Sequence, residues 1–162
     1  MSANYHHTDE NVLILPGAVV VGDVSFGPGC CVWFNAVLRA DVDSIRVGEK
    51  TNIQDNATLH TGHGFPIRIG AGCIVAHNAI VHGCTIGDNT LVGMGAIVLN
   101  GAVVGSNCII AAGALVTQGM TVPDGSMVMG APAKIRRALT PEEIEGLRRG
   151  AQFYFENKEN YR

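Results

Sequence analysis

Three histidines stand in a repeating sequence that fixes where their side chains can point. His60, His77 and His82 lie in or beside a run that divides into six-residue blocks, among them IGAGCI, VAHNAI, IGDNTL, VGMGAI and VLNGAV. Neutral imidazoles are common ligands of catalytic zinc, and three of them leave one coordination position open. The residue types therefore indicate a metal centre, provided that the fold brings the three rings together.

The repeat itself predicts the fold. Each block opens on Ile or Val and usually carries a small residue near its fifth position. Such a short period predicts an all-β solenoid, a parallel β-helix in which the opening aliphatic residues point inward and Gly, Asp and Asn form the corners. A left-handed helix of triangular cross-section, with three blocks to each coil, is implied by a resemblance to the hexapeptide-repeat proteins. We expect it over about residues 12–130 of a single domain, 1–162.

Two blocks are longer than six residues, LRADVDSIR and LHTGHGFPIR. Because the repeat stays in phase on both sides of each, we expect the extra residues to leave one corner as outward loops. A solenoid tolerates such insertions, and binding faces are often built from them.

The repeat decays after Val122, and a helix is expected over about residues 140–160. Thr140 is a suitable N-cap, Pro141 fits the first helical position, and Glu142 and Glu143 lie in the first turn. A helix lying along the end of the prism would protect its open strand edges.

The block positions place two of the three histidines on one strip of the prism. Counting from Val47 assigns the opening residues to three faces: Val47, Ile69 and Ile86 to the first, Ile53, Val75 and Val92 to the second, and Leu59, Val81 and Val98 to the third. His60 and His82 each hold the second place of a third-face block, one coil apart. Their rings should stack at about 4.8 Å and can share one metal ion.

His77 holds the third place of a second-face block and therefore lies on another part of the prism. We expect a neighbouring copy of the chain to supply it, in a trimer with cyclic threefold symmetry. Each interface would then combine His60 and His82 of one subunit with His77 of the next.

Further polar residues accompany the histidines. Arg39 takes the place of His60 one coil earlier, Asp41 follows it, and Gln54 and Asp55 lie in the intervening coil. Across an interface, Arg39 could pair with either carboxylate. The Gln54 amide could orient a metal-bound water without ionising. An alternative of equal weight is that Arg39 and Asp41 only form an interface salt bridge.

Composition excludes several classes of function. A net charge of −3 gives no reason to expect binding to nucleic acid or to an anionic membrane. No apolar stretch approaches the roughly 20 residues of a membrane span, and the start, MSANYHHTDE, lacks the apolar core of a secretory signal. The five cysteines are interpreted as buried small hydrophobes in a reducing cytoplasm, where we place the protein.

The stretches VWFNAVLRAD, TNIQDNATLH, VAHNAIVHGCTIG and VGMGAIVLNGAVVG closely resemble the γ-class carbonic anhydrases, over nearly the whole chain. The resemblance implies a left-handed β-helix with a C-terminal helix, assembled as a homotrimer. It implies one divalent metal per subunit interface, zinc first and iron or cobalt as alternatives, held by His60, His77 and His82. The implied activity is a lyase reaction, the reversible hydration of CO2 to bicarbonate by a metal-bound hydroxide.

The same resemblance assigns further site residues. It implies an Arg39–Asp41 pair, with Gln54 and Asp55 near the metal. In the helix it points to Tyr154 and, in a looser register, Asn157.

The chain also departs from the archetype of the family. Val42 follows Asp41, and the loop after His60 carries His63 where the archetype has an acidic residue. Because histidine side chains can take up and release protons near neutral pH, His63 is suited to carry a proton from the site to bulk buffer.

Two other functions fit parts of the sequence. MGAPAKIRR resembles the ending of coenzyme A-dependent acetyltransferases of this fold, in which His63 would be the general base and an acyl-CoA the substrate. A metal-stabilised trimeric scaffold without catalysis is the second alternative, and thioester hydrolysis a related one. Metal content separates the acyltransferase from the others.

Overall fold

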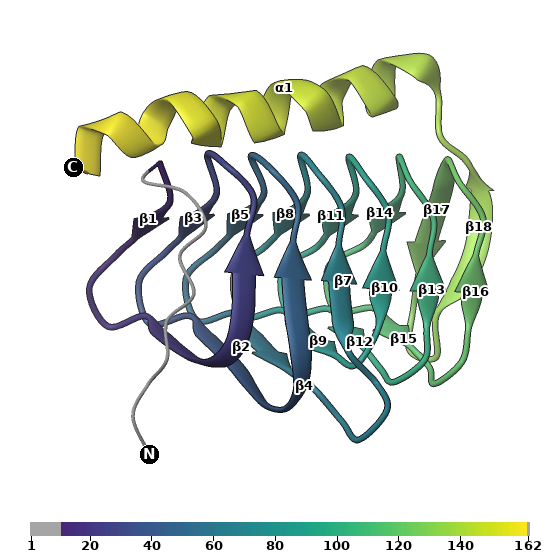
Figure 1. The fold of residues 1–162 in the computed structure, drawn as a ribbon. Helices are drawn as coiled ribbons and strands as arrows, with labels where there is room; N and C mark the ends of the chain where they lie inside the picture. The colour runs from purple at the N-terminus through teal and green to yellow at the C-terminus, as the bar shows by residue number, and fades with distance from the viewer. Residues whose placement is uncertain (1–10, 162) are drawn as a thin grey trace.

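In the computed structural model, which describes residues 11–161, the chain winds into a parallel β-solenoid of about six turns and ends in a helix (Figure 1). The second face contains β1 (Leu13–Ile14), β3 (Cys31–Val32), β5 (Asn52–Ile53), β8 (Ile74–Val75), β11 (Leu91–Val92), β14 (Ile109–Ile110) and β17 (Ser126–Met129). The third contains β6 (Thr58–His60), β9 (Ile80–His82), β12 (Ile97–Val98) and β15 (Leu115–Val116). The first contains β7 (Ile67–Ile69), β10 (Thr85–Ile86), β13 (Val103–Val104) and β16 (Thr121–Val122), and the long strands β2 (Val19–Phe26) and β4 (Val37–Val47) span the third and first faces. The solenoid class expected from the repeat is confirmed.

Strand register confirms the assignment of blocks to faces. The paired opening residues are Val47, Ile69 and Ile86 on the first face, Ile53, Val75 and Val92 on the second, and Leu59, Val81 and Val98 on the third. All nine are buried, and together with small Ala and Cys side chains they fill the interior. Asparagines with positive φ form several corners, at Asn35, Asn56, Asn78, Asn89 and Asn107.

The two overlong segments lie on adjacent coils at the corner between the third and first faces. The first was expected to be a loop, and this was wrong: β4 runs through it as extended chain, and residues 41–44 bulge opposite Asp23 of β2. The reason is that β2 pairs with β4 on both sides of the corner, so the surplus is absorbed within the ladder. The second segment does form a loop, 61–66, closed by two backbone hydrogen bonds between Gly62 and Phe65.

The helix α1 (Pro141–Asn157) lies along the side of the solenoid, contrary to the expectation that it would cover an end (Figure 1). A capping box fixes its start, because the Thr140 hydroxyl accepts from the Glu143 N–H while the Glu143 carboxylate accepts from the Thr140 N–H. Leu147 and Ala151 are its buried residues. They lie about one turn apart on the same side of the helix, which is the side that packs against the solenoid.

The last coil is covered by β18 (Lys134–Ala138), which pairs antiparallel with β17. Every residue of β18 is exposed, and three of its five are basic. An edge strand rich in Lys and Arg discourages pairing with another chain. This hairpin therefore has the protective role that we expected of the helix.

All five cysteines are buried and unpaired, as the sequence predicts. Burial raises the pKa of Cys30, Cys73 and Cys84 to about 12, so these thiols stay protonated and serve as packing.

None of the helices within residues 11–161 is long and apolar enough to cross a membrane. The segment MSANYHHTDE, on which the expectation of no secretory signal depends, lies outside the described residues, as do His6 and His7 within it.

Candidate metal centre

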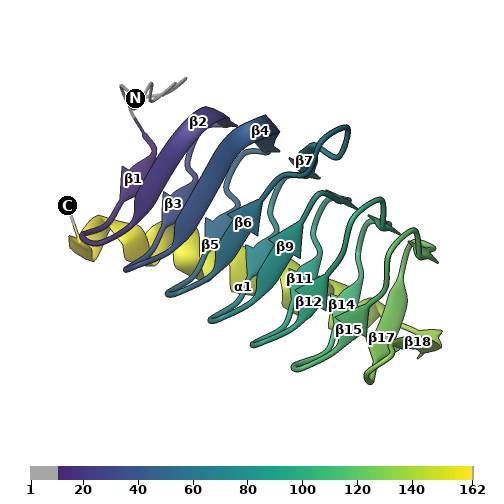
Figure 2. The same ribbon diagram turned by 90° about the horizontal axis from the view of Figure 1, so that it is seen from below.

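His60 and His82 form a close pair on the third face. β6 and β9 lie side by side (Figure 2) and pair in parallel, with His60 opposite His82. The two ring centroids lie 4.9 Å apart. The nearest ring atoms are His60 Nδ1 and His82 Nε2, 2.9 Å apart. The expected position of His82 one coil from His60 therefore agrees with the structure, although the two rings meet edge-on, at 70°, and not face to face.

Asp41 holds His60 from the other side. Its Oδ1 lies 3.1 Å from His60 Nε2, and its Oδ2 accepts from Arg39 Nη1 at 2.5 Å. The Arg39 guanidinium, with a smaller contribution from His60, lowers the pKa of the Asp41 carboxyl. The bulge after Arg39 turns Asp41 back toward the ring, so the overlong block builds part of this site.

Asn100 is a residue of the site that the sequence analysis did not identify. Its Oδ1 lies 2.5 Å from His82 Nδ1. Asn100 stands third in the block that opens at Val98, one coil after His82. The sequence feature that could have identified it is a polar residue at the third place of a third-face block.

The donor chemistry of the pair fits a cation. The Asp41 carboxylate can only accept, which favours the proton of His60 on Nε2, and the carbonyl oxygen of Asn100 favours the proton of His82 on Nδ1. The two remaining lone pairs, on His60 Nδ1 and His82 Nε2, then face each other across 2.9 Å. Both can bind one divalent ion, and second partners of this kind are typical of metal-binding histidines.

His77 lies apart from this pair. It follows β8 at the corner between the second and third faces, and its Nδ1 lies 2.9 Å from Asp55 Oδ2. The buried Gln54 accepts a hydrogen bond from the His77 backbone N–H through Oε1, at 3.2 Å. Within residues 11–161 of one chain, no three His, Cys, Asp or Glu side chains gather as a metal-binding group. The structure thus divides the predicted residues into a His60–His82 group and a His77 group.

An apolar row runs beside the His60–His82 pair. The outward positions at the start of the paired third-face strands are Val19, Val37, Thr58, Ile80, Ile97 and Leu115. Figure 2 shows these strands, β2, β4, β6, β9, β12 and β15, side by side. Val19 and Ile80 are among the exposed large hydrophobic residues. We call these six residues the third-face row.

The structure does not bring His63, Tyr154 or Asn157 against the histidines. His63 is exposed at the tip of loop 61–66. Tyr154 packs edge-on against Trp33, with ring centroids 6.3 Å apart, and Asn157 accepts a hydrogen bond from Asn160. Sequence reasoning could not place these residues, because none of them belongs to the repeat.

A buried polar neighbourhood lies beside Gln54. Asn52 Oδ1 and Nδ2 and Trp33 Nε1 are buried without a hydrogen-bond partner in the described part of the chain. Trp33 and Gln54 directly follow the paired strands β3 and β5, and the Trp33 backbone N–H donates to the Ile53 carbonyl. Ordered water is the usual partner of such atoms.

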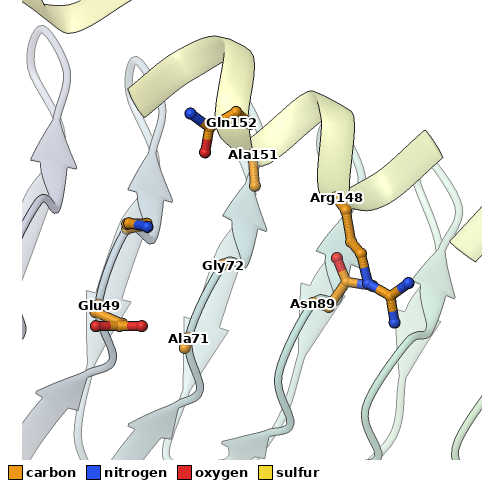
Figure 3. A pocket seen from close by; sticks show the side chains of 8 residues that line it. Glu49, Ala71, Gly72, Asn89, Arg148, Ala151 and Gln152 are labelled. Carbon is orange, nitrogen blue, oxygen red and sulfur yellow. The ribbon is translucent and has the colours of Figure 1, made fainter. Parts of the chain in front are cut away.

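A groove of about 400 Å³ lies elsewhere (Figure 3). It separates α1 from the corner between the first and second faces, with Arg148 and Gln152 on the helix side and Glu49 and Asn89 on the solenoid side. Arg148 already pairs with Glu145, and Asn89 donates to Asn107. The groove therefore follows the contact between α1 and the solenoid, and Arg148 and Asn89 in its lining already have partners.

Comparison with known proteins places the chain in a family. The family model described as bacterial transferase hexapeptide (six repeats) matches residues 83–118. A Methanocaldococcus jannaschii protein named "probable carbonic anhydrase" is 53% identical, over 90% of this chain and 91% of its own. The mitochondrial γ-carbonic anhydrase 2 of Arabidopsis thaliana is 44% identical over 90% of this chain, which spans only 55% of that relative. The solved structure of a hexapeptide transferase family protein from Anaplasma phagocytophilum is 42% identical, with a TM-score of 0.91 over 95% of this chain and 91% of that one. Together with the fold and the histidine register, these similarities show that the chain belongs to the γ-carbonic anhydrase family of hexapeptide-repeat proteins.

Proposed function

We propose that the protein is a homotrimeric carbonate dehydratase, which hydrates CO2 reversibly at a divalent metal held between His60 and His82 of one copy and His77 of the next. The observation that carries the proposal is the approach of two ring nitrogens, His60 Nδ1 and His82 Nε2, to 2.9 Å, which lets both bind one cation. The names of the M. jannaschii and Arabidopsis relatives support the reaction class. Zinc is the first candidate, although imidazole also suits iron and cobalt.

The position of His77 supports sharing of the site between copies. His77 lies at one corner of the third face, whereas His60 and His82 lie towards the opposite corner. Because Asp55 engages Nδ1, the Nε2 atom of His77 is available to a partner. Cyclic symmetry would bring one copy's His77 corner to its neighbour's His60–His82 strip and repeat that contact three times.

The third-face row supports the same assembly. Five of its six members are Val, Ile or Leu, and they line up beside the histidines along the solenoid. Contiguous exposed apolar side chains usually mark an interaction surface. A neighbouring copy seated there would bury the row and deliver its His77.

A divalent cation held by neutral imidazoles supplies Lewis acidity, which lets water lose its proton near neutral pH. The chain's own groups prepare the site. Asp41, Asp55 and Asn100 orient His60, His77 and His82 respectively.

Gln54, brought by the same copy as His77, would orient the attacking water or the bicarbonate product through its amide. Arg39 holds Asp41 ionised beside His60. His63 would carry the released proton from the exposed loop to buffer. Tyr154 would act from outside the histidine cluster, through Trp33 beside Gln54.

The five buried free thiols support a reducing compartment, the cytoplasm.

Acyl transfer is the second candidate, because the Anaplasma relative bears a transferase name. In that reaction His63 would be the general base and an acyl-CoA the donor. The segment that resembles the acetyltransferase ending forms the β17–β18 hairpin here.

The test is elemental analysis of anaerobically purified protein with stopped-flow CO2 hydration on the same sample. We expect near-stoichiometric metal and a hydration rate that rises with imidazole buffer, because the loop lacks an acidic shuttle. His63→Ala should slow the reaction only at low buffer, whereas Gln54→Ala should slow it about 10²-fold at all buffer concentrations. A metal-replete trimer without hydration would overturn the proposed function in favour of scaffold or acyl-transfer roles.

A further inference from the structure

The Asn100 side chain is closely packed by its neighbours next to His82. A Cβ atom added to Gly83 would lie 2.6 Å from Asn100 Oδ1 and 2.7 Å from Phe65 Cβ, and one added to Gly62 would lie 3.2 Å from Asn100 Nδ2. These distances show that the amide is enclosed by two glycine backbones and by Phe65 of loop 61–66. Its backbone is fixed as well, since the Asn100 carbonyl accepts from the Gly119 N–H.

This setting controls which nitrogen of His82 bears the proton. A neutral imidazole can carry its proton on either nitrogen, and the hydrogen bond made by one nitrogen decides the state of the other. The Asn100 oxygen, 2.5 Å from His82 Nδ1, can accept a hydrogen bond from Nδ1–H, and this tautomer has its lone pair on Nε2.

The alternative tautomer would close the site. If Nε2 carried the proton, it would point at His60 Nδ1, which is only 2.9 Å away, and the two histidines would bond directly to each other. That bond would occupy both lone pairs that a cation needs. His60 cannot prevent it, because its own proton is directed at Asp41.

We propose that Asn100 is a positioning residue, which holds His82 with its proton on Nδ1 and so keeps the Nε2 lone pair free for the cation. The inference rests on the proposed function. It adds a neutral amide to the carboxylates Asp41 and Asp55, so that His82 is oriented without another negative charge in the site. It also gives loop 61–66 a structural role, because Phe65 helps to confine the amide.

The first experiment uses the wild-type protein without metal, so no variant has to fold. Nitrogen-15 NMR of the imidazole rings distinguishes the two tautomers of a neutral histidine. We expect the Nδ1–H form at His82 at a pH where the ring is neutral. Observation of the Nε2–H form would overturn the proposal.

The second experiment compares zinc affinity, measured by competition with a chelator. Asn100→Leu has a similar volume but no acceptor, and it should weaken zinc binding about 10–100-fold. Asn100→Asp keeps an oxygen at the same place and should retain most of the affinity. Gln152→Leu, which removes a surface amide from α1, serves as the matched control and should bind zinc like the wild type.

An Asn100→Leu protein that folds and binds zinc as tightly as the wild type would contradict the inference. If that variant fails to fold, the wild-type tautomer decides. If the wild type itself binds no zinc, the proposed function fails, and the NMR result still decides whether Asn100 sets the tautomer.

Discussion

Trimers of the His77→Ala variant should retain little of the metal that the wild-type protein binds. A site with three protein ligands has none to spare, and the remaining pair, His60 and His82, offers only two nitrogens. Hydration activity should fall with metal content. The fold should persist, because the His77 side chain is 43% exposed and bonds only to Asp55 at the surface. Elemental analysis and light scattering of the same preparation measure both quantities.

His63→Ala is the matched control, since it removes an exposed histidine from the nearby loop. It should keep full metal occupancy. If His77→Ala also kept full occupancy, His77 could not be a ligand.

Ile80→Lys should dissociate the trimer and remove the metal, although all three histidines remain. Ile80 is 39% exposed in the single chain and lies near the centre of the third-face row. Burying an ammonium group there without a partner costs several kcal/mol and should disfavour association. Light scattering should report a mass near that of the 17.0 kDa chain.

Val103→Lys provides the comparison, because Val103 is 46% exposed at a strand position on the first face. It should leave the trimer and its metal intact. If Ile80→Lys remained trimeric with bound metal, the third-face row would not be the interface.

The six-residue period was sufficient to predict the site's central pair. It fixes the strand register, so that His60 had to lie opposite His82, and it assigns His77 to another face. Arg39 was placed for the same reason, one strand from His60. These positions follow from counting residues, because a parallel solenoid repeats its register on every coil.

The contacts made outside the regular register could not be predicted in this way. Asp41 reaches His60 because residues 41–44 bulge from the ladder opposite the single residue Asp23, and the period does not describe a bulge. Asn100 contacts His82 from the turn that follows β12, where the direction of a side chain depends on the local backbone angles. The β17–β18 hairpin was missed because its strands pair antiparallel after the repeat has ended.

The most direct test of a site shared between copies is complementation in mixed trimers. His77→Ala and His60→Ala proteins each lack a ligand at every interface, so each alone should bind little metal. When the two are co-expressed in equal amounts, about three-quarters of trimers contain both chains, and cyclic symmetry gives each of these one intact site in three. Metal and CO2 hydration should therefore return to about a quarter of the wild-type level. Mixed trimers that bind no more metal than the separate variants would contradict the shared site.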